Sequence, residues 1–440
     1  MQLRKWVLRI LRQSDILLAL KAGATSWSLV VPERRDEYQL EQLNETWKEA
    51  VANVPFYAMW KQRHQLPDEI TSFEEYAKWP ILTKRDIQEH AEMFKRKTNE
   101  PVHWSVTGGA TGEPLHFGTF RAQGKRTTAE LLLARAGLGV LPGDKILLFW
   151  GHRHFYGYGF ASKVRFFVRR CKDWLNNTCR LDACNLSEQY LVFVGRKMLR
   201  QKPEVVIAYS ASLLAFCRYM RAEGLRFQRL GIRCVICSAG PLSLDERKEI
   251  STFFAAPVYM EYGSMEGGLL AYMAKDGRYV VHHNTRILQT QFDGVGHLNL
   301  VTSLYSDYLP LFRYQIGDYL SGCEYTPDGR VLTIGEVWGR ASDLLTLPSG
   351  QMIHGYTFMV LAESFAKILA YQLVKKGSTY ILSLKVSSSL TEDEKAYLYE
   401  KAYSIVPELR NVDLLIEEAE DLVKAPSGKI RLFVDLSQKS

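Results

Sequence analysis

From about residue 145 onward, short apolar runs alternate with longer amphipathic segments. Four of the runs are "KILLFW" at 145–150, "EVVIAY" at 204–209, "IRCVICS" at 232–238 and "PVYMEY" at 257–262. Each is too short for a helix and rich in β-branched or aromatic residues, which predicts a strand. A capping box of Ser243 and Glu246 opens one of the intervening helical segments. This order predicts an α/β sheet with parallel connections.

The pattern differs on both sides of this region. Residues 35–100 alternate amphipathic helical segments with loops, and Thr71 with Glu74 predicts a capping box at the start of "TSFEEYAKW". After residue 295 the chain reads as strands and turns. The last hundred residues predict a small α+β unit, with one helix capped by Thr391 and Glu394.

These elements predict an α/β fold in two parts. We expect a large N-terminal α/β domain with parallel sheets and a β-rich subdomain at 1–339, followed by a small mobile α+β C-terminal domain at 340–440. The boundary is placed in "WGRASD" at 338–343.

Composition narrows the function classes only slightly. The chain has 440 residues and a formal net charge of +8, which suits an anionic ligand or a membrane surface. It has no long Lys/Arg run, so we do not expect a nucleic-acid partner. Seven irregularly spaced cysteines indicate a reducing compartment, hence the cytoplasm. Cys234 and Cys237 lie three apart in a predicted strand and face opposite sides, which argues against a shared zinc ion.

The N-terminal segment leaves two interpretations open. Leu3, Trp6, Val7, Ile10 and Leu11 share one helical face, and basic residues surround it. Residues 1–20 either form a helix docked on their own domain or make a peripheral contact with the inner face of a membrane. Interrupting charges exclude a signal peptide, and no stretch is long enough for a transmembrane helix.

The stretch "WSVTGGATGEPLHFGT" at 104–119 is unusually rich in glycine and threonine. Consecutive glycines let backbone N–H groups converge on an anion, and Thr107 and Thr111 add hydroxyl donors, so the segment reads as a phosphate cradle. A P-loop would need Lys and Ser/Thr after Gly112, where the chain has Glu113 and Pro114. No dinucleotide-binding glycine fingerprint fits either.

Residues 107–114 resemble the phosphate-binding loop of the adenylate-forming superfamily of acyl-CoA synthetases, luciferases and adenylation domains. They match that pattern at every position except Ala110, which lacks the usual hydroxyl. The resemblance implies that the phosphates of ATP are held by Thr107, Gly108, Gly109, Thr111 and Gly112. It also implies that Thr111 is a catalytic residue.

Five more segments resemble the other motifs of this superfamily, in the same order along the chain. "SAGPL" implies an adenine-binding backbone at Ala239, Gly240 and Pro241. "EYGSMEGG" implies nucleotide contacts from Glu261, Tyr262, Gly263 and Ser264, with Tyr262 on the base and Glu266 as catalytic Mg²⁺ ligand. "FRYQIGD" implies ribose binding by Asp318, and "WGRASDLLTL" implies Arg340 near the nucleotide and a hinge at Asp343. "APSGKIR" implies the catalytic lysine, Lys429.

Other segments resemble one branch of the superfamily. "NVPFYAMW" and "WPILTKRDI" are similar to the phenylacetate–CoA ligase-like branch, and "NLSEQYL" with the compact C-terminal unit is similar to its capsular-polysaccharide-biosynthesis members. The resemblance implies an enzyme: an ATP-dependent, AMP-forming ligase that activates a small carboxylic acid in polysaccharide or secondary metabolism. Lys429 would lie between the carboxylate and the α-phosphate, where a positive charge offsets their repulsion.

Several points stay open at this stage. The acceptor is a thiol, with coenzyme A as co-substrate, or an amine. A catalytically weak nucleotide-binding scaffold is the alternative from another class, and Ala110 supports it. The acyl pocket is expected around His152, His154, Tyr156 and Tyr209. His282 and His283 are expected to be structural or second-site residues and not catalytic ones. The acid and the oligomeric state do not follow from the sequence.

Overall fold

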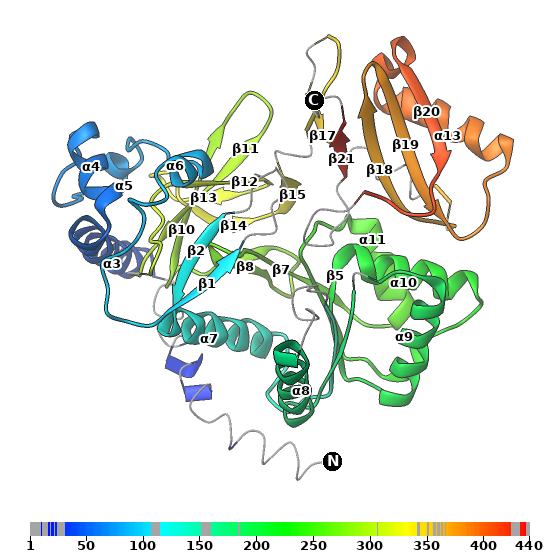
Figure 1. Ribbon diagram of the computed structural model, residues 1–440, viewed down its shortest axis with the longest axis horizontal. Helices are drawn as coiled ribbons and strands as arrows, with labels where there is room; N and C mark the ends of the chain where they lie inside the picture. Colours follow the sequence, from blue (N-terminus) through cyan, green and yellow to red (C-terminus); the bar gives the residue numbers. More distant parts are fainter. Residues whose placement is uncertain are drawn as a thin grey trace. The chain divides into compact units, whose positions relative to one another are not determined.

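The computed structural model of the chain describes residues 10, 16–17, 19–21, 23, 31–106, 115–150, 160–183, 185–305, 307–340, 344–349, 352–354, 358, 361, 364–365, 367–423 and 432–436 (Figure 1). The chain forms two compact units. The first consists of Met1–Thr107, Glu113–Gly143 and Met260–Trp338. The second consists of Gly108–Gly112, Asp144–Tyr259 and Gly339–Ser440.

Among the described residues of the first unit, four helices between residues 32 and 89 lie around an aromatic cluster. They are α3 (Pro32–Asn53), α4 (Pro55–His64), α5 (Phe73–Tyr76) and α6 (Lys84–Glu89). Trp47 of α3 is fully buried and makes edge-on ring contacts with Trp79 and Phe312, at centroid distances of 4.8 Å and 5.2 Å. Such aromatic contacts add to the burial of apolar area and fix these helices against the sheet strands of the same unit.

The expected cap of α5 is one residue off. Ser72, not Thr71, is the N-cap, and its hydroxyl accepts a hydrogen bond from the backbone N–H of Glu75. The Thr71 hydroxyl instead donates to the Glu75 carboxylate at 2.7 Å. Both Thr71–Glu74 and Ser72–Glu75 have the spacing of a capping box, so the pattern alone could not choose between them.

The strands of the first unit pair mainly in antiparallel fashion. One set runs in the order β13-β14-β9-β8-β7, and another in the order β10-β11-β12-β15. Their bounds are β7 (Val258–Ser264), β8 (Gly268–Met273), β9 (Tyr279–Val281), β10 (Arg286–Phe292), β11 (His297–Ser303), β12 (Tyr314–Ser321), β13 (Glu324–Tyr325), β14 (Val331–Ile334) and β15 (Glu336–Arg340). A separate hairpin pairs β1 (Val102–Val106) with β2 (His116–Phe120) up to Val106 and His116, and α7 (Arg121–Gly137) follows it directly.

Four parallel strands form the centre of the second unit, in the order β6-β5-β3-β4. They are β3 (Ile146–Phe149), β4 (Thr178–Leu181), β5 (Val205–Tyr209) and β6 (Cys234–Ser238), as the short apolar runs predicted. The connecting helices are α8 (Phe160–Leu175), α9 (Glu188–Gln201), α10 (Ser210–Ala222) and α11 (Leu244–Phe254), with a short 3-10 turn η2 (Gln228–Leu230) before β6. The chain runs from β3 outward to β4 and then back past β3 to β5, so right-handed crossovers place α8 on one face and α9, α10 and α11 on the other (Figure 1).

The rest of the second unit is the small α+β part that the sequence predicted. A hairpin of β16 (Leu344–Thr346) and β17 (Met352–His354) comes first. A four-stranded sheet follows, in the order β20-β19-β18-β21, made of β18 (Ile368–Lys376), β19 (Thr379–Val386), β20 (Asp413–Glu418) and β21 (Phe433–Asp435). Helix α13 (Glu392–Ile405) packs on this sheet through Leu398 and Ala402, and η5 (Pro407–Asn411) follows it. The predicted capping box of Thr391 and Glu394 is present.

These observations confirm the predicted fold class, a large α/β region with a β-rich part and a small α+β unit near the C-terminus. The predicted boundary between 1–339 and 340–440 and the mobility of the second part stay predictions. No helix in the described part of the chain combines the length and the apolar character needed to cross a bilayer.

Candidate functional site

Tyr262 and Asp318, which come from two different sequence motifs, are hydrogen-bonded partners. The Tyr262 hydroxyl donates to Asp318 Oδ2 at 2.9 Å, and it accepts a hydrogen bond from Asn299 Nδ2 at 2.8 Å. All three side chains are buried. The amide, the hydroxyl and the carboxylate therefore form a chain of donors and acceptors in which each group fixes the orientation of the next.

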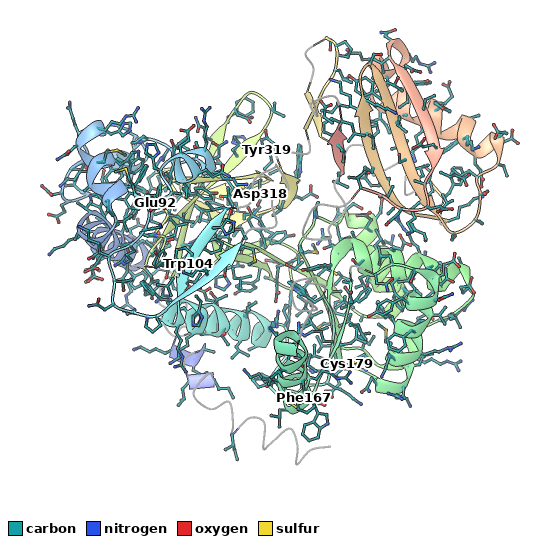
Figure 2. All side chains as sticks on the ribbon, in the orientation of Figure 1. Glu92, Trp104, Phe167, Cys179, Asp318 and Tyr319 are labelled. Carbon is teal, nitrogen blue, oxygen red and sulfur yellow. The ribbon has the colours of Figure 1, made fainter. Side chains whose placement is uncertain are left out.

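An irregularity in the sheet brings these three residues together. Leu298 of β11 pairs with Tyr319 of β12, but Leu300 pairs with Gln315, so β12 has two extra residues opposite Asn299. Gly317 lies in this bulge with a φ of +83°, a backbone conformation that glycine adopts without a steric penalty. Bulges redirect side chains, and this one presents Asp318 toward Tyr262 (Figure 2 labels Asp318 and its neighbour Tyr319).

The segment after Tyr262 is a tight turn that requires glycine. A Cβ atom on Gly263 would lie 2.3 Å from the carbonyl oxygen of Gly268, which no side chain allows. The Ser264 hydroxyl accepts a hydrogen bond from the backbone N–H of Gly267 at 2.8 Å, which closes the turn. Arg286 Nε donates to the Gly267 carbonyl at 2.8 Å. These contacts explain the glycine at 263 and fix the backbone of the turn on which Glu266 lies.

Glu266 lies at this turn and is partly exposed. The buried Tyr314 hydroxyl approaches its carboxylate at 3.5 Å, the upper limit for a hydrogen bond. In the described part of the chain, no group of three or more acidic, histidine or cysteine side chains is placed to hold a metal ion. A single carboxylate of this kind fits Mg²⁺, which keeps most of its waters and needs few protein ligands beside a phosphate.

Glu261 makes a different kind of contact from its neighbours. Both of its carboxylate oxygens accept from the guanidinium of Arg135 on α7, at 2.7 Å and 3.0 Å. Such a bidentate pair is directional and stabilises the end of β7 against α7. Its predicted contact with the nucleotide stays a prediction.

The "SAGPL" segment of the second unit is shaped by one serine that the sequence analysis did not single out. The single hydroxyl proton of Ser210, the first residue of α10, is shared between the carbonyl oxygens of Gly240 at 2.8 Å and Ser238 at 3.1 Å. Between these carbonyls, Ala239 adopts a φ of +69°, which is uncommon for a residue with a side chain. Ser210 therefore holds a strained backbone segment at the carboxyl end of β6.

Tyr209 lies at the carboxyl end of the parallel strands, where the connections between strands change direction along the sheet. It ends β5, and its ring contacts that of Trp150, which follows β3, at a centroid distance of 4.5 Å. The connection that leaves β3 runs toward β4, and the connection that leaves the adjacent strand β5 runs in the opposite direction, toward β6. The ends of β3 and β5 therefore form a topological switch point, where α/β sheets bind ligands. An acyl pocket at this location is compatible with the sheet topology. The role of Tyr209 in such a pocket stays a prediction.

Several predicted site residues lie outside the described residues: Thr107, Gly108, Gly109, Thr111, Gly112, His152, His154, Tyr156, Asp343 and Lys429. Arg340 ends β15, and its side chain is not described. The expectation for His282 and His283 fits their surroundings, since burial lowers the pKa of His282 to about 3 and that of His283 to about 4.

Asn299, Ser210, Arg286 and Tyr314 were missed by the sequence analysis. Of these four, only Asn299 could have been noticed in the sequence. It is a polar residue between Leu298 and Leu300, in a strand that is buried on both faces. Ser210 and Arg286 act by holding backbone carbonyls, and such contacts leave no sequence pattern.

Two sequence relatives cover most of this chain. Protein CapK of Staphylococcus aureus is 24% identical over 313 residues, which is 70% of this chain and 68% of CapK. Phenylacetate–coenzyme A ligase of Pseudomonas putida is 25% identical over 330 residues, 71% of this chain and 72% of the ligase. No family model matches the chain.

Solved structures of the same fold cover more of the chain. A 2-hydroxyisobutyryl-CoA ligase in its postadenylation state superimposes with a TM-score of 0.71 at 16% identity, over 92% of this chain and 90% of the ligase. The same ligase in its thioesterification state gives a TM-score of 0.59 at 17% identity, with the same coverage. Together with the sequence relatives, this shared fold confirms the resemblance described above.

Proposed function

We propose that this chain, a member of the adenylate-forming superfamily in its phenylacetate–CoA ligase-like branch, is an ATP-dependent, AMP-forming ligase for a small carboxylic acid. The observation that carries the proposal is the hydrogen-bonded chain from Asn299 through Tyr262 to Asp318. It joins two of the six motifs on which the resemblance rests, although Tyr262 and Asp318 are 56 residues apart.

Asp318 is the group that we assign to the ribose of ATP. A carboxylate accepts hydrogen bonds from two vicinal hydroxyls, and these bonds are charge-assisted. Tyr262 donates to one carboxylate oxygen and thereby fixes the plane of the group before the nucleotide arrives. By the resemblance, the Tyr262 ring contacts the base, so one residue orients both recognition elements.

The backbone at 239–241 is assigned to the adenine. The resemblance places adenine along this segment, and the Ser210 hydroxyl bonds the carbonyls of Ser238 and Gly240, on either side of Ala239. A fixed backbone reads the base by its edge without requiring any particular side chain at Ala239. The glycine-rich segment 107–112 is assigned to the phosphates on its sequence alone.

We propose Mg²⁺ as the metal of the reaction, held by Glu266 beside the phosphates. When bound, Mg²⁺ would neutralise phosphate charge and orient the leaving pyrophosphate. Arg286 and Ser264 hold the turn that carries Glu266, so this carboxylate is presented from a defined backbone.

The barrier in adenylation comes from the approach of two anions. The substrate carboxylate attacks the α-phosphorus of ATP, a new C–O–P link forms, and the bond to pyrophosphate breaks. Lys429, by the resemblance, supplies a positive charge between the carboxylate and the phosphate, where exclusion of water strengthens its effect. The C-terminal part, 340–440, would deliver this lysine by rotation about Asp343, a hinge motion of a few residues.

In the second half-reaction a nucleophile takes the acyl group and AMP leaves. Coenzyme A is the first acceptor to test, because phenylacetate–CoA ligase matches 71% of the chain. An amine on a sugar or amino acid is the other acceptor, in keeping with a role in polysaccharide or secondary metabolism. We place the enzyme in the cytoplasm, where residues 1–20 either form a helix docked on their own domain or make a peripheral contact with the inner face of the membrane. Sedimentation of a Trp6→Ser variant with vesicles tests that contact.

The test of the ligase activity is a screen for pyrophosphate release with ATP, Mg²⁺ and a panel of aryl acids, amino acids and uronic acids. We expect release that depends on one class of acid, and formation of the acyl product when coenzyme A or an amine is added to the responding acid. Binding of ATP without pyrophosphate release for every acid would instead support the nucleotide-binding scaffold.

A further inference from the structure

A buried group of charged side chains lies behind the turn that carries Glu266. Arg286 is the member that touches the turn: its Nε donates to the Gly267 carbonyl at 2.8 Å, and its Nη1 donates to the Thr285 carbonyl at 2.7 Å. The Arg286 side chain is only 4% exposed. A guanidinium that is removed from water needs a counter-charge, so the position of this side chain depends on the acid that it faces.

That acid is Asp307, whose side chain is only 2% exposed. Its Oδ2 lies 3.8 Å from Arg286 Nη2, and its Oδ1 accepts a hydrogen bond from Arg126 of α7. Asp307 is therefore an anion between two guanidiniums. Without it, the two positive charges would face each other with little water to screen them. The Asp307 carboxylate thus keeps Arg286 in place against the Gly267 carbonyl.

Helix α7 supports this group of charges. It contributes Glu130, a buried acid that forms a hydrogen bond with Thr285. Burial raises the pKa of the Glu130 carboxyl, and the charge of Arg286 opposes that shift. Thr127 of the same helix lies near the end of the turn, since a Cβ atom on Gly268 would meet Thr127 Oγ1 at 3.7 Å and Arg286 Nη2 at 3.3 Å. The end of the turn therefore packs against α7 directly as well as through the charged group.

The same helix holds the start of the segment. Arg135 of α7 makes the bidentate ion pair with Glu261, one residue before Tyr262. Helix α7 therefore fixes the segment on both sides of Glu266. It also follows β2 directly, and β1 and β2 flank the glycine-rich residues 107–114 (Figure 1). One rigid helix thus joins the segment assigned to the phosphates to the carboxylate assigned to Mg²⁺.

We propose that Asp307 is a positioning residue that holds the Glu266 carboxylate in place for its metal ion. Asp307 holds Arg286, Arg286 holds the Gly267 carbonyl, and the turn then presents Glu266 from a fixed backbone. Residues that orient a metal ligand in this way commonly determine the affinity of the site. The inference rests on the proposed role of Glu266 as the Mg²⁺ ligand, and it adds the residues that determine how tightly the metal binds.

Direct binding of Mn²⁺, as a probe for Mg²⁺, tests this without any acid substrate. The electron paramagnetic resonance signal of free Mn²⁺ is titrated with the full chain and an ATP analogue that has a methylene group between the α- and β-phosphates. We expect Asp307→Asn to weaken Mn²⁺ binding by roughly tenfold and Asp307→Glu to restore part of it. Affinity for the analogue without metal should stay unchanged, because Tyr262 and Asp318 recognise the nucleoside.

Two further variants separate positioning from a general loss of stability. Asp144→Asn removes a carboxylate that is 4% exposed and pairs with Arg233, at the amino end of β3 and so away from the ligand-binding ends of the strands. It should lower the free energy of unfolding but keep the wild-type affinity for Mn²⁺. Arg126→Gln is a milder change, because this side chain is 29% exposed and Arg286 keeps its pair with Asp307. It should weaken Mn²⁺ binding less than Asp307→Asn does.

The proposal also predicts that the effects of Asp307→Asn and Glu266→Gln are not additive. If Asp307 acts through Glu266, Asp307→Asn should weaken Mn²⁺ binding no further once Glu266 has been replaced. Additive losses would overturn the proposal, because Asp307 would then act on the metal by another route. Wild-type affinity in Asp307→Asn and Arg126→Gln, with weakened binding in Glu266→Gln, would overturn it and leave the proposed function in place. Wild-type affinity in Glu266→Gln would instead contradict the metal ligand on which both proposals rest.

Discussion

The Tyr262 hydroxyl donates a hydrogen bond to the Asp318 carboxylate at 2.9 Å. The two residues lie on neighbouring sheets of the first unit, and the bulge in β12 opposite Asn299 brings them together. If Asp318 binds ribose and Tyr262 contacts the base, this bond couples the recognition of the two halves of adenosine.

Removing that bond should weaken nucleotide binding without unfolding the protein. Tyr262→Phe keeps the ring but leaves a buried carboxylate oxygen without its donor, so we expect the KM for ATP to rise by roughly tenfold, with a smaller change in kcat. The measurement is steady-state pyrophosphate release at saturating acid. Tyr272→Phe, a half-buried tyrosine of β8, is the matched control and should leave the KM unchanged.

Asn299→Leu separates the two hydrogen bonds of the same hydroxyl. It removes the donor to Tyr262 but leaves the bond to Asp318, so its effect on the KM for ATP should be smaller than that of Tyr262→Phe. Equal effects would mean that the three groups act only as one unit.

The strands of the second unit could be predicted because each is a short apolar run bounded by polar or small residues. The individual site residues of the first unit could also be named from their motifs. Their pairing could not be, because it depends on a two-residue register shift between β11 and β12. Such a shift is set by tertiary packing and has no local signal apart from Gly317, whose positive φ the bulge requires.

The wrong N-cap predicted for α5 also reflects a choice that the local sequence pattern does not determine. Two overlapping pairs, Thr71–Glu74 and Ser72–Glu75, satisfy the same spacing, and the choice depends on which side chain faces the free N–H groups. The cap at Ser243 had no such competitor and is confirmed. The cap at Thr391 is also confirmed, although Ser389 and Glu392 have the same spacing. Ser210 was missed because its partners are carbonyls of another strand.

Gly263→Ala should damage the site through the backbone. The new Cβ would lie 2.3 Å from the Gly268 carbonyl oxygen, so the turn carrying Glu266 must move. We expect a loss of about 1–3 kcal/mol in the free energy of unfolding together with a loss of pyrophosphate release. Chemical denaturation and the release assay measure the two effects. Gly124→Ala, in α7 with open space around it, should be neutral or slightly stabilising. Wild-type stability in Gly263→Ala would contradict the close approach of the two backbones.

The buried histidines predict a loss of stability in mild acid. Burial lowers the pKa of His282 to about 3 and that of His283 to about 4, against an ordinary value of 6.5. Above pH 6.5 neither state is protonated at these residues. As the pH falls from 6.5 toward 4, the unfolded state takes up protons that the folded state cannot. Each histidine should therefore reduce the free energy of unfolding by up to about 1.4 kcal/mol per pH unit.

Urea denaturation between pH 7 and pH 5 measures that slope. His283→Gln keeps a donor for the Leu332 carbonyl, which His283 Nε2 approaches at 3.2 Å, and it removes the titration, so its slope should be shallower than that of the wild type. His64→Gln changes an exposed histidine and should have the wild-type slope. Identical slopes in all three proteins would mean that His283 does not stay neutral in the folded state.

Lys429→Ala tests the chemistry assigned to the C-terminal segment "APSGKIR". If this lysine neutralises the two approaching anions, its loss should reduce ATP–pyrophosphate exchange by roughly a hundredfold to a thousandfold or more. Binding of ATP should remain largely intact, because Tyr262 and Asp318 recognise the nucleoside. Calorimetric titration with ATP and the exchange assay separate the two effects. Lys424→Ala, five residues earlier in the sequence, is the matched control and should keep both properties. Unchanged exchange in Lys429→Ala would show that this lysine has no role in adenylation. Loss of ATP binding as well as exchange would mean that the lysine binds ATP in the ground state and does not act only in the transition state.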